Sequence, residues 1–343
     1  MRSHVRTAVV VLLAAGLLAL FVHNVDLWGA MAAIAHARPG WLALSLATTF
    51  ANLAIRAFRW QYLLEPLGRP TFTNAFRATA VGFAANSVLP ARAGEVIRPY
   101  FLSRYEPLSA TGAFATIILE RLLDTLTVLV QLAAFVLLFG AGASATNPMV
   151  FRAVKWAGAT AAAVSIVALV ILFVLAGNPE RLGRTLTRLE EVMPSTLAGL
   201  LARIAEKFAR GLGIIRRPGR LLAALALSVP LWLSIDVGIW AVAMAFGFDV
   251  PFPGSFLILA FLVIGVAVPT PGAIGGFHEA FRLAATGFYG VPDDAAVGAA
   301  IVLHALSIGP ALLLGLLFAA DAGVNVSRMR QIAEAPTEQG NPA

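Results

Sequence analysis

Three charged residues interrupt one of the most apolar stretches of the sequence. Glu120, Arg121 and Asp124 lie between runs of isoleucine and leucine in the segment 111–139. At about 1.5 Å per residue, Glu120 lies roughly 14 Å from the start of that segment, so we expect it near the middle of a membrane. A charge at that depth costs on the order of 2.5–3.5 kcal/mol. The three side chains should therefore face protein or water rather than lipid.

Helical spacing places Glu120 and Asp124 on one face, because residues four apart are neighbours on a helix. The predicted partner of these carboxylates is Arg92 or Arg98, from the segment that precedes the helix, and Arg121 should turn towards a neighbouring element. Two interpretations stay open. The charges either form a binding site for an anionic ligand, or they form an ion-pair cluster that fixes the preceding segment to this helix.

Further polar residues interrupt other apolar stretches. Asp236 and His304 each fall near the middle of one, where they either carry a proton or make a hydrogen bond within the helix packing. Arg56 and Arg59 lie close to the inner end of the segment 41–62. We interpret them as anchors that extend to the membrane surface, with contact to a phosphate as the alternative.

Two breaks rich in proline and glycine share one order of residues. Each follows a short apolar stretch, and each leads into Glu-x-x-Arg, at Glu95 in the first break and at Glu279 in the second. Such breaks persist in a membrane only where protein or a wet cavity surrounds them, and paired breaks indicate a transporter site between inverted repeats. The alternative is two kinks with local ion pairs. The candidate binding residues are Asn86, Arg92, Gly94, Glu95, Arg98, Glu120, Arg121, Asp124, Asp236, Pro269, Pro271, Gly272, Gly275, Gly276, Glu279 and Arg282.

The composition is that of a membrane protein. Of 343 residues, 59% are hydrophobic and 13% are charged, whereas soluble domains have about 25% charged residues. We interpret the first apolar stretch as a span rather than a signal peptide, because the cleavage-like Ala35-His36-Ala37 lies too far beyond it. Six stretches are long enough to cross a bilayer of about 30 Å, namely 5–22, 41–62, 111–139, 153–176, 221–246 and 295–321.

Basic residues set the expected orientation. The segment 177–220 carries nine arginine or lysine residues and four glutamates, which places it in the cytoplasm. All basic segments lie in the cytoplasm only if the short apolar segments do not cross the membrane completely. Segment 75–89 would then enter and leave by the cytoplasmic face, and segments 255–268 and 276–288 would together enter and leave by the opposite face. We therefore predict an all-α polytopic membrane protein with six full spans, two opposed re-entrant hairpins and an inverted repeat. The expected parts are a membrane domain at 1–325, with an amphipathic surface connector at 177–220, and a disordered tail at 326–343; both termini are cytoplasmic.

Several classes of chemistry are excluded. Without cysteine there is no disulfide, thiolate metal site, iron–sulfur cluster or cysteine nucleophile. The net charge of +7 fits cytoplasmic loops and anionic lipids rather than nucleic acid. Neither a phosphate-binding loop of the Gly-x-x-x-x-Gly-Lys type nor a metal-ligand spacing is present. We expect no cofactor, no metal and no nucleic-acid partner.

The motifs at 86–95, at 119–124 and at 269–276 with Glu279 together resemble a known family. The chain looks like the flippase-like transmembrane region of the lysylphosphatidylglycerol synthases, the multiple peptide resistance factors, over about residues 5–325. The resemblance implies a bacterial or archaeal inner-membrane protein that moves or presents an aminoacylated, isoprenoid-linked or hopanoid-linked lipid. Those synthases add a soluble transferase domain after this region, whereas here the polar residues 323–343 follow, so we expect no lipid synthesis. The resemblance implies that a central cavity is lined by the following residues: Arg92, Gly94, Glu95, Arg98, Glu120, Arg121, Asp124, Pro271, Gly272, Gly276 and Glu279.

Three functions stay open at this point. The leading one is a lipid transporter, not an enzyme, in which arginines and half-helix ends hold an anionic head group. The second is a membrane-embedded transferase that acts on a lipid-linked acceptor, with Glu95 or Asp124 as general base. The third is a scaffold subunit of a lipid or cell-envelope synthase, which would have little use for buried charges. The expected partners are membrane lipids and a separate lipid-modifying synthase.

Overall fold

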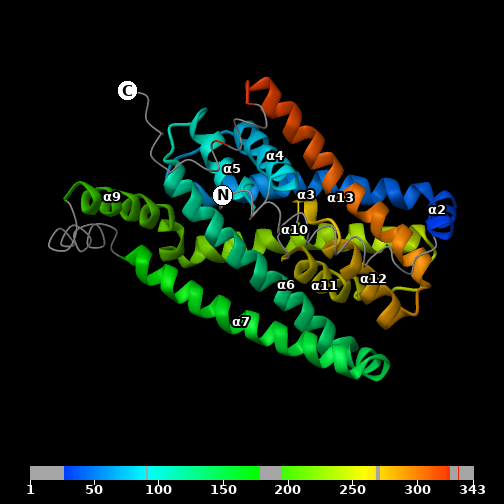
Figure 1. Cartoon of the computed structure of the whole chain (residues 1–343). Helices are drawn as coiled ribbons and strands as arrows, with labels where there is room; N and C mark the ends of the chain where they lie inside the picture. Colours follow the sequence, from blue (N-terminus) through cyan, green and yellow to red (C-terminus); the bar gives the residue numbers. More distant parts are fainter. Residues whose placement is uncertain (1–26, 90–91, 178–194, 268–270, 325–330, 332–343) are drawn as a thin grey trace, which may run out of the picture.

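The structure is a computed structural model that describes residues 27–89, 92–177, 195–267, 271–324 and 331. Within these ranges the regular structure is helical throughout (Figure 1). The α-helices are α2 (Leu27–Ala35), α3 (Pro39–Leu63), α4 (Phe72–Val88), α5 (Gly94–Ser103), α6 (Ala110–Thr146), α7 (Pro148–Gly177), α9 (Ser195–Gly211), α10 (Pro218–Ala245), α11 (Gly254–Ala267), α12 (Gly276–Tyr289) and α13 (Asp293–Asp321). Two short 3-10 helices, η2 (Gly213–Arg216) and η3 (Pro271–Ala273), join them.

Five of these helices are long and apolar enough to cross a membrane: α3, α6, α7, α10 and α13. They coincide with the predicted spans from 41–62 onwards and confirm that these five stretches are helices of sufficient length and apolarity. The predicted first span, 5–22, lies outside the described residues. Proline stands at the start of both α3 and α10, where its missing N–H costs nothing and its fixed φ favours the first helical turn.

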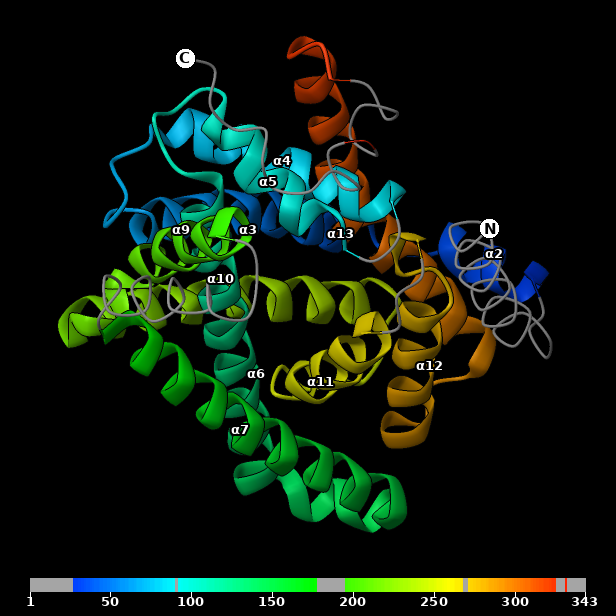
Figure 2. The same cartoon turned by 60° about the vertical axis from the view of Figure 1, so that its left-hand side comes forward.

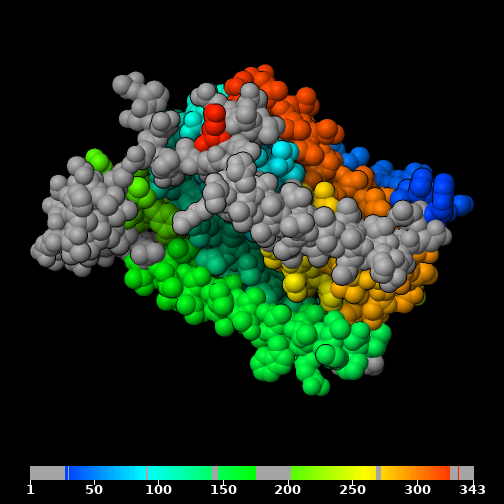
Figure 3. All heavy atoms as spheres, in the orientation of Figure 1, coloured from blue at the N-terminus to red at the C-terminus, as the bar shows by residue number. Residues whose placement is uncertain are grey.

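The long helices form a packed layer with pairs of shorter helices on both sides. In two views α3 and α10 run side by side between the α4–α5 pair and the α11–α12 pair (Figures 1 and 2). Helix α6 crosses this layer, and α13 packs along α4. Helix α7, green along the lower edge in Figure 3, exposes apolar side chains such as Val167, Ile171 and Phe173. An apolar face on a helix of this length suits contact with lipid.

The two pairs of short helices are held together in the same way. A Cβ on Gly94 of α5 would collide with the carbonyl oxygen of Gly82 in α4. Likewise, Gly265 of α11 and Gly276 of α12 each leave no room for a Cβ on the other. Small residues let helix backbones approach this closely within membranes. These pairs correspond to the two predicted hairpins, while their depth in a membrane and their relation as an inverted repeat stay predictions.

The predicted surface connector is described only in its second half, because residues 178–194 lie outside the described ranges. That half contains α9, which packs along α6. Its buried side includes Ala202 and Ala209, and its exposed side includes Arg203, Lys207 and Arg210. Such a two-sided helix is typical of a segment that lies at a membrane surface.

Candidate functional site

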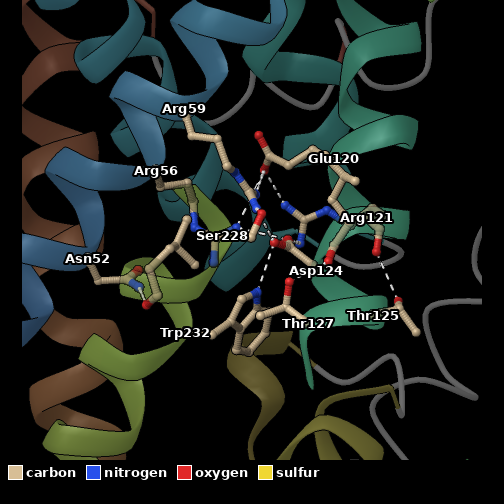
Figure 4. Close-up of polar contacts among 12 residues, drawn as sticks. Asn52, Arg56, Arg59, Glu120, Arg121, Asp124, Thr125, Thr127, Ser228 and Trp232 are labelled. Atoms are coloured by element: carbon tan, nitrogen blue, oxygen red, sulfur yellow. Dashed lines mark hydrogen bonds and ion pairs between the residues drawn. The ribbon is translucent and has the colours of Figure 1, made fainter. Parts of the chain in front are cut away.

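Glu120 and Asp124 project from one face of α6 into the centre of the helix layer. Both are buried, with 0% and 4% of their surfaces exposed. Two arginines of α3 reach them (Figure 4): Arg59 Nη1 lies 2.7 Å from Asp124 Oδ1, and Arg56 Nη1 lies 3.1 Å from Asp124 Oδ2 and 3.4 Å from Glu120 Oε1. The α10 residues Ser228 and Trp232 complete the group. Ser228 accepts a hydrogen bond from Arg59 at 2.6 Å, and the Trp232 indole donates to Asp124 at 3.0 Å.

The interpretation of Arg56 and Arg59 as anchors at the membrane surface was wrong. Only 4% and 0% of their surfaces are exposed, and both guanidinium groups bind carboxylates of α6. The reason is the packing of α3 along α10, which turns the two arginines inward. Their long side chains then meet α6 rather than the membrane surface.

The segment before α6 supplies one more partner, as predicted. Arg98 of α5 donates to Glu120 Oε1 at 3.0 Å and lies over the Trp60 ring at 3.9 Å. It does not form the local ion pair with Glu95 that was the alternative. Glu95 instead lies 3.9 Å from Arg92 and 3.8 Å from Arg121.

Arg92 and Arg121 are the more accessible members of the group. About half of the Arg92 side chain is exposed, and its guanidinium makes long contacts, 3.5 Å to the Val266 carbonyl oxygen and 3.9 Å to Glu95. Its backbone has φ +54°, which an arginine adopts only under some strain. Arg121 donates to Glu120 at 2.7 Å and keeps a third of its side chain exposed.

Positive charge exceeds negative charge in this cluster. Four arginines contact two buried carboxylates, while Arg92 and Glu95 balance each other. Several guanidinium nitrogens are buried without a hydrogen-bond partner among the described residues, which is costly inside a protein. They are Arg56 Nε, Arg59 Nε and Nη2, Arg98 Nε and Nη2, and Arg121 Nε.

A cavity of about 460 Å³ adjoins the cluster, within the size range of pockets that hold small molecules. Its charged end contains Arg56, Arg92, Glu95, Arg121 and Asp124. A row of polar residues from α3 follows, and most of the remaining wall is apolar. The polar row is Ser45, Thr48, Thr49 and Asn52, and the apolar side chains include Val128, Leu259, Leu262, Val263, Val266, Leu303 and Ile308.

Of the predicted residues at the two breaks, Asn86 and Gly272 line the cavity together with Arg92 and Glu95. Asn86 also accepts a hydrogen bond from the Gly94 N–H at 2.8 Å, which joins α4 to α5. Gly272 and Gly275 have positive φ values of +61° and +88°, which glycine adopts freely. Gly94 and Gly276 lie at the close helix contacts described above. Pro271 begins η3, and Pro269 lies outside the described residues.

Four further residues that the sequence singled out lie apart from the charged end of the cavity. Glu279 and Arg282 form a local ion pair at 2.6 Å, as the alternative expected, and Arg282 also reaches Asp293 at 2.6 Å. Asp236 lies behind the cavity wall, where it accepts a hydrogen bond from Gln131 at 2.6 Å. His304 Nε2 lies 2.7 Å from the Gly272 carbonyl oxygen, so this histidine supports the second break.

Sequence reasoning missed the polar row of α3, although a signal for it exists. Ser45, Thr48, Thr49, Asn52 and Arg56 recur at the spacing of one helix face. A polar stripe on an otherwise apolar span predicts a face turned towards water or a polar ligand. Read in that way, the stripe would have placed Arg56 inside the protein.

Comparison with known proteins identifies related sequences over most of the chain. The family model described as the lysylphosphatidylglycerol synthase TM region matches residues 7–315. The glycosyltransferase AglD of Haloferax volcanii is 25% identical over 313 residues, which are 84% of this chain and 50% of AglD.

Two archaeal membrane proteins match over shorter stretches. The UPF0104 membrane protein MJ1595 of Methanocaldococcus jannaschii is 31% identical over 90 residues, 25% of this chain and 27% of that protein. A UPF0104 membrane protein of Methanothermobacter thermautotrophicus is 31% identical over 96 residues, 27% of this chain and 28% of that protein. The matches thus span half or less of the length of each of these relatives.

Proposed function

This chain belongs to the family of the lysylphosphatidylglycerol synthase transmembrane region, and we propose that it binds the anionic head group of a membrane lipid in its cavity and moves that lipid between the leaflets. The observation that supports this proposal most strongly is the net positive charge of the buried cluster. Four arginines against two carboxylates leave two charges without a counter-ion among the described residues. Uncompensated charge is expensive at membrane depth, so a bound anion would stabilise this arrangement.

The kind of cation favours a phosphate. A guanidinium group presents a planar fork of N–H donors that matches two phosphate oxygens. Arg92 and Arg121 are accessible from the cavity and keep part of their hydrogen-bonding capacity free. A phosphate at the charged end would bring its negative charge next to both.

The remaining cavity wall suits the rest of a lipid. Beyond the charged end lie the hydroxyl and amide groups of α3, which can bind a glycerol or sugar part of a head group. The wall formed by α11 and α13, with Leu262, Val263 and Ile308, is apolar and suits an acyl or isoprenoid chain. This sequence of surfaces follows the order of groups in an amphiphilic lipid.

The net charge of the head group also ranks the candidate lipids by how well they should bind. A phosphatidylglycerol or an isoprenoid-linked phosphate brings negative charge to the excess of arginine. Lysylated phosphatidylglycerol adds two ammonium groups to its phosphate and would gain less from the same site. We therefore place the unmodified anionic lipid ahead of the aminoacylated one.

The proposed movement uses the two pairs of short helices. In this proposal α4–α5 and α11–α12 enter the membrane from opposite faces and rock against each other around the cavity, as the halves of inverted-repeat transporters do. The protein lies in the inner membrane with both termini in the cytoplasm. The carboxylates Glu95, Glu120 and Asp124 exchange arginine partners as the head group arrives and leaves.

Lipid translocation by the purified protein in liposomes tests this proposal. Liposomes contain fluorescent phosphatidylglycerol, lysylated phosphatidylglycerol or phosphatidylcholine, and a reductant that cannot cross the membrane removes the outer-leaflet label. We expect the anionic lipid to become accessible fastest. Arg121→Gln should slow it, whereas Arg282→Gln, which removes an arginine away from the cavity, should not. Equal rates for all three lipids, or rates no faster than in protein-free liposomes, would contradict the proposal.

A second function has support from one relative. AglD is a glycosyltransferase and matches this chain over 313 residues, which fits a membrane-embedded transferase that acts on a lipid-linked acceptor. The match covers half of AglD, so its activity comes to this chain only as an alternative. In that case Glu95, which is partly exposed in the cavity, would serve as general base. Transfer of a group to a lipid acceptor, abolished by Glu95→Gln, would favour it over transport.

A further inference from the structure

Helices α6 and α10 share a row of buried or partly buried polar side chains that extends beyond the arginine cluster. We name this row the polar seam; it consists of Glu120, Asp124, Thr127 and Gln131 on α6 and Ser228, Trp232 and Asp236 on α10. The spacing in each helix is three or four residues, so each set lies on one helix face. The seam begins among the arginines and ends at Asp236.

The two ends of the seam differ in charge. Glu120 and Asp124 each contact several arginines. At the other end, Asp236 and Gln131 are 0% and 8% exposed, and Gln131 Nε2 donates to Asp236 Oδ2 at 2.6 Å. Among the described residues no basic side chain forms an ion pair with Asp236. An ionised carboxylate in this position would be a buried charge without a counter-ion.

Two oxygen atoms of this pair are buried without a hydrogen-bond partner in the described part of the chain: Asp236 Oδ1 and Gln131 Oε1. Both are acceptors if Asp236 is ionised, so neither can satisfy the other. A proton on Asp236 Oδ1 turns that oxygen into a donor that can serve Gln131 Oε1. A carboxylic acid and a primary amide can join through two such antiparallel hydrogen bonds. One proton therefore removes the charge and satisfies both oxygens.

The pair lies close to the cavity although it does not line it. Asp236 is one helical turn from Trp232, or about 6 Å along α10, and Trp232 lines the cavity and donates to Asp124. Gln131 is two turns from Asp124 along α6, with Thr127 between them. The polar side chains of the seam therefore continue from Asp236 towards the cavity.

The charged surroundings of Asp236 come from few elements. Along α6 the acidic groups of the seam are Asp124 and Glu120, and the arginines of α3 lie beside these two carboxylates. Helix α11 carries no titratable residue. The titratable residue in the middle of α13, His304, bonds to the Gly272 carbonyl oxygen.

We propose that Asp236 and Gln131 form a proton-binding site, in which Asp236 holds its proton on Oδ1 at neutral pH and releases it along the polar seam. The atom balance is simple, since a carboxylic acid gives a carboxylate and one proton. The coupling of proton release to lipid movement rests on the function proposed above. The protonated state of Asp236 is independent of that function.

Infrared spectroscopy of the full chain in nanodiscs tests the protonated state directly. A protonated carboxyl has a carbonyl stretch well separated from the stretches of a carboxylate. We expect the wild type to show this band at neutral pH and Asp236→Asn to lose it. Asp249→Asn, which changes an exposed aspartate just after α10, should keep it. An unchanged band in Asp236→Asn would overturn the proposal.

A second variant covers the case in which Asp236→Asn does not fold. Gln131→Leu leaves the acid in place and removes the acceptor for its proton, so the band should move to higher frequency. A band at the wild-type position would show that Gln131 does not bind the proton, against the proposal. Translocation against pH, measured in parallel, reports on coupling: loss of pH dependence in Asp236→Asn supports it, and retention contradicts it whatever the infrared result.

Discussion

Removal of a carboxylate from the buried cluster should harm the protein more than removal of an arginine. Glu120→Gln keeps the shape of the side chain and deletes its charge, which raises the positive excess of the cluster from two to three. Arg121→Gln lowers the same excess to one. The two substitutions are adjacent in sequence and change the charge of the cluster by one unit in opposite directions, so they compare the two signs of charge.

The expected magnitudes follow from the contacts. Glu120 Oε1 lies 2.7 Å from Arg121 Nη2 and 3.0 Å from Arg98 Nη1, and the Glu120 side chain is fully buried. Breaking a buried ion pair costs about 3–5 kcal/mol, because the remaining charges stay buried and unpaired. Arg121 is a third exposed, and the carboxylates keep three other arginines, so its loss should cost about 1 kcal/mol or less.

Tryptophan fluorescence during chemical unfolding in detergent micelles measures this difference. Trp60 lies under Arg98, and Trp232 bonds to Asp124, so two reporters adjoin the cluster. We expect Glu120→Gln to lower the free energy of unfolding well below that of Arg121→Gln. If Arg121→Gln proved the more damaging of the two, the inference of an uncompensated positive charge would be wrong.

Three other predictions follow from the same structure. Gly94→Ala should destabilise the protein by about 1–3 kcal/mol through overpacking, seen as a lower yield of folded protein, whereas Gly219→Ala, which meets open space, should not. Partial burial would raise the pKa of Glu106, but hydrogen bonds led by the Thr71 N–H outweigh it and lower that pKa. Ionised Glu106 therefore stabilises the folded protein above the pKa of about 4.3 that glutamate has in the unfolded chain, and this stabilisation is lost as pH falls through the lower pKa of the folded state. A titration of unfolding free energy with acid should show the loss in the wild type and not in Glu106→Gln. Arg92→Ala, at a half-exposed side chain, should abolish transport in the liposome assay and leave the unfolding free energy nearly unchanged.

The long helices could be predicted from the sequence because hydrophobicity and length fix them locally. A run such as 221–246 is apolar over the thickness of a bilayer, and no competing structure satisfies its backbone there. The short helices α4 and α11 could be predicted as incomplete spans for the same reason. Their close pairing through glycines depends on contacts between different helices, which local patterns do not show.

The site was predictable mainly where residues close together in the sequence determine it. Glu120 and Asp124 share a face by their spacing alone, and the preceding segment had few cations besides Arg98 to offer. The contribution of Arg56 and Arg59 depends on how α3 lies against α6, a contact between segments far apart in the chain. Glu95 and Glu279 stand in similar motifs, yet only Glu95 reaches the cavity, because Arg282 binds Glu279 and Asp293 on the other side.

Identification of the lipid that the protein retains is the most direct test of an anionic head-group site in the cavity. The purified chain is equilibrated in nanodiscs of equal amounts of phosphatidylglycerol and phosphatidylcholine, released, and analysed by native mass spectrometry. We expect the wild type and Arg282→Gln to retain phosphatidylglycerol, and the double variant Arg92→Gln with Arg121→Gln to lose this preference. Equal retention of the two lipids by the wild type would contradict the proposed head-group site.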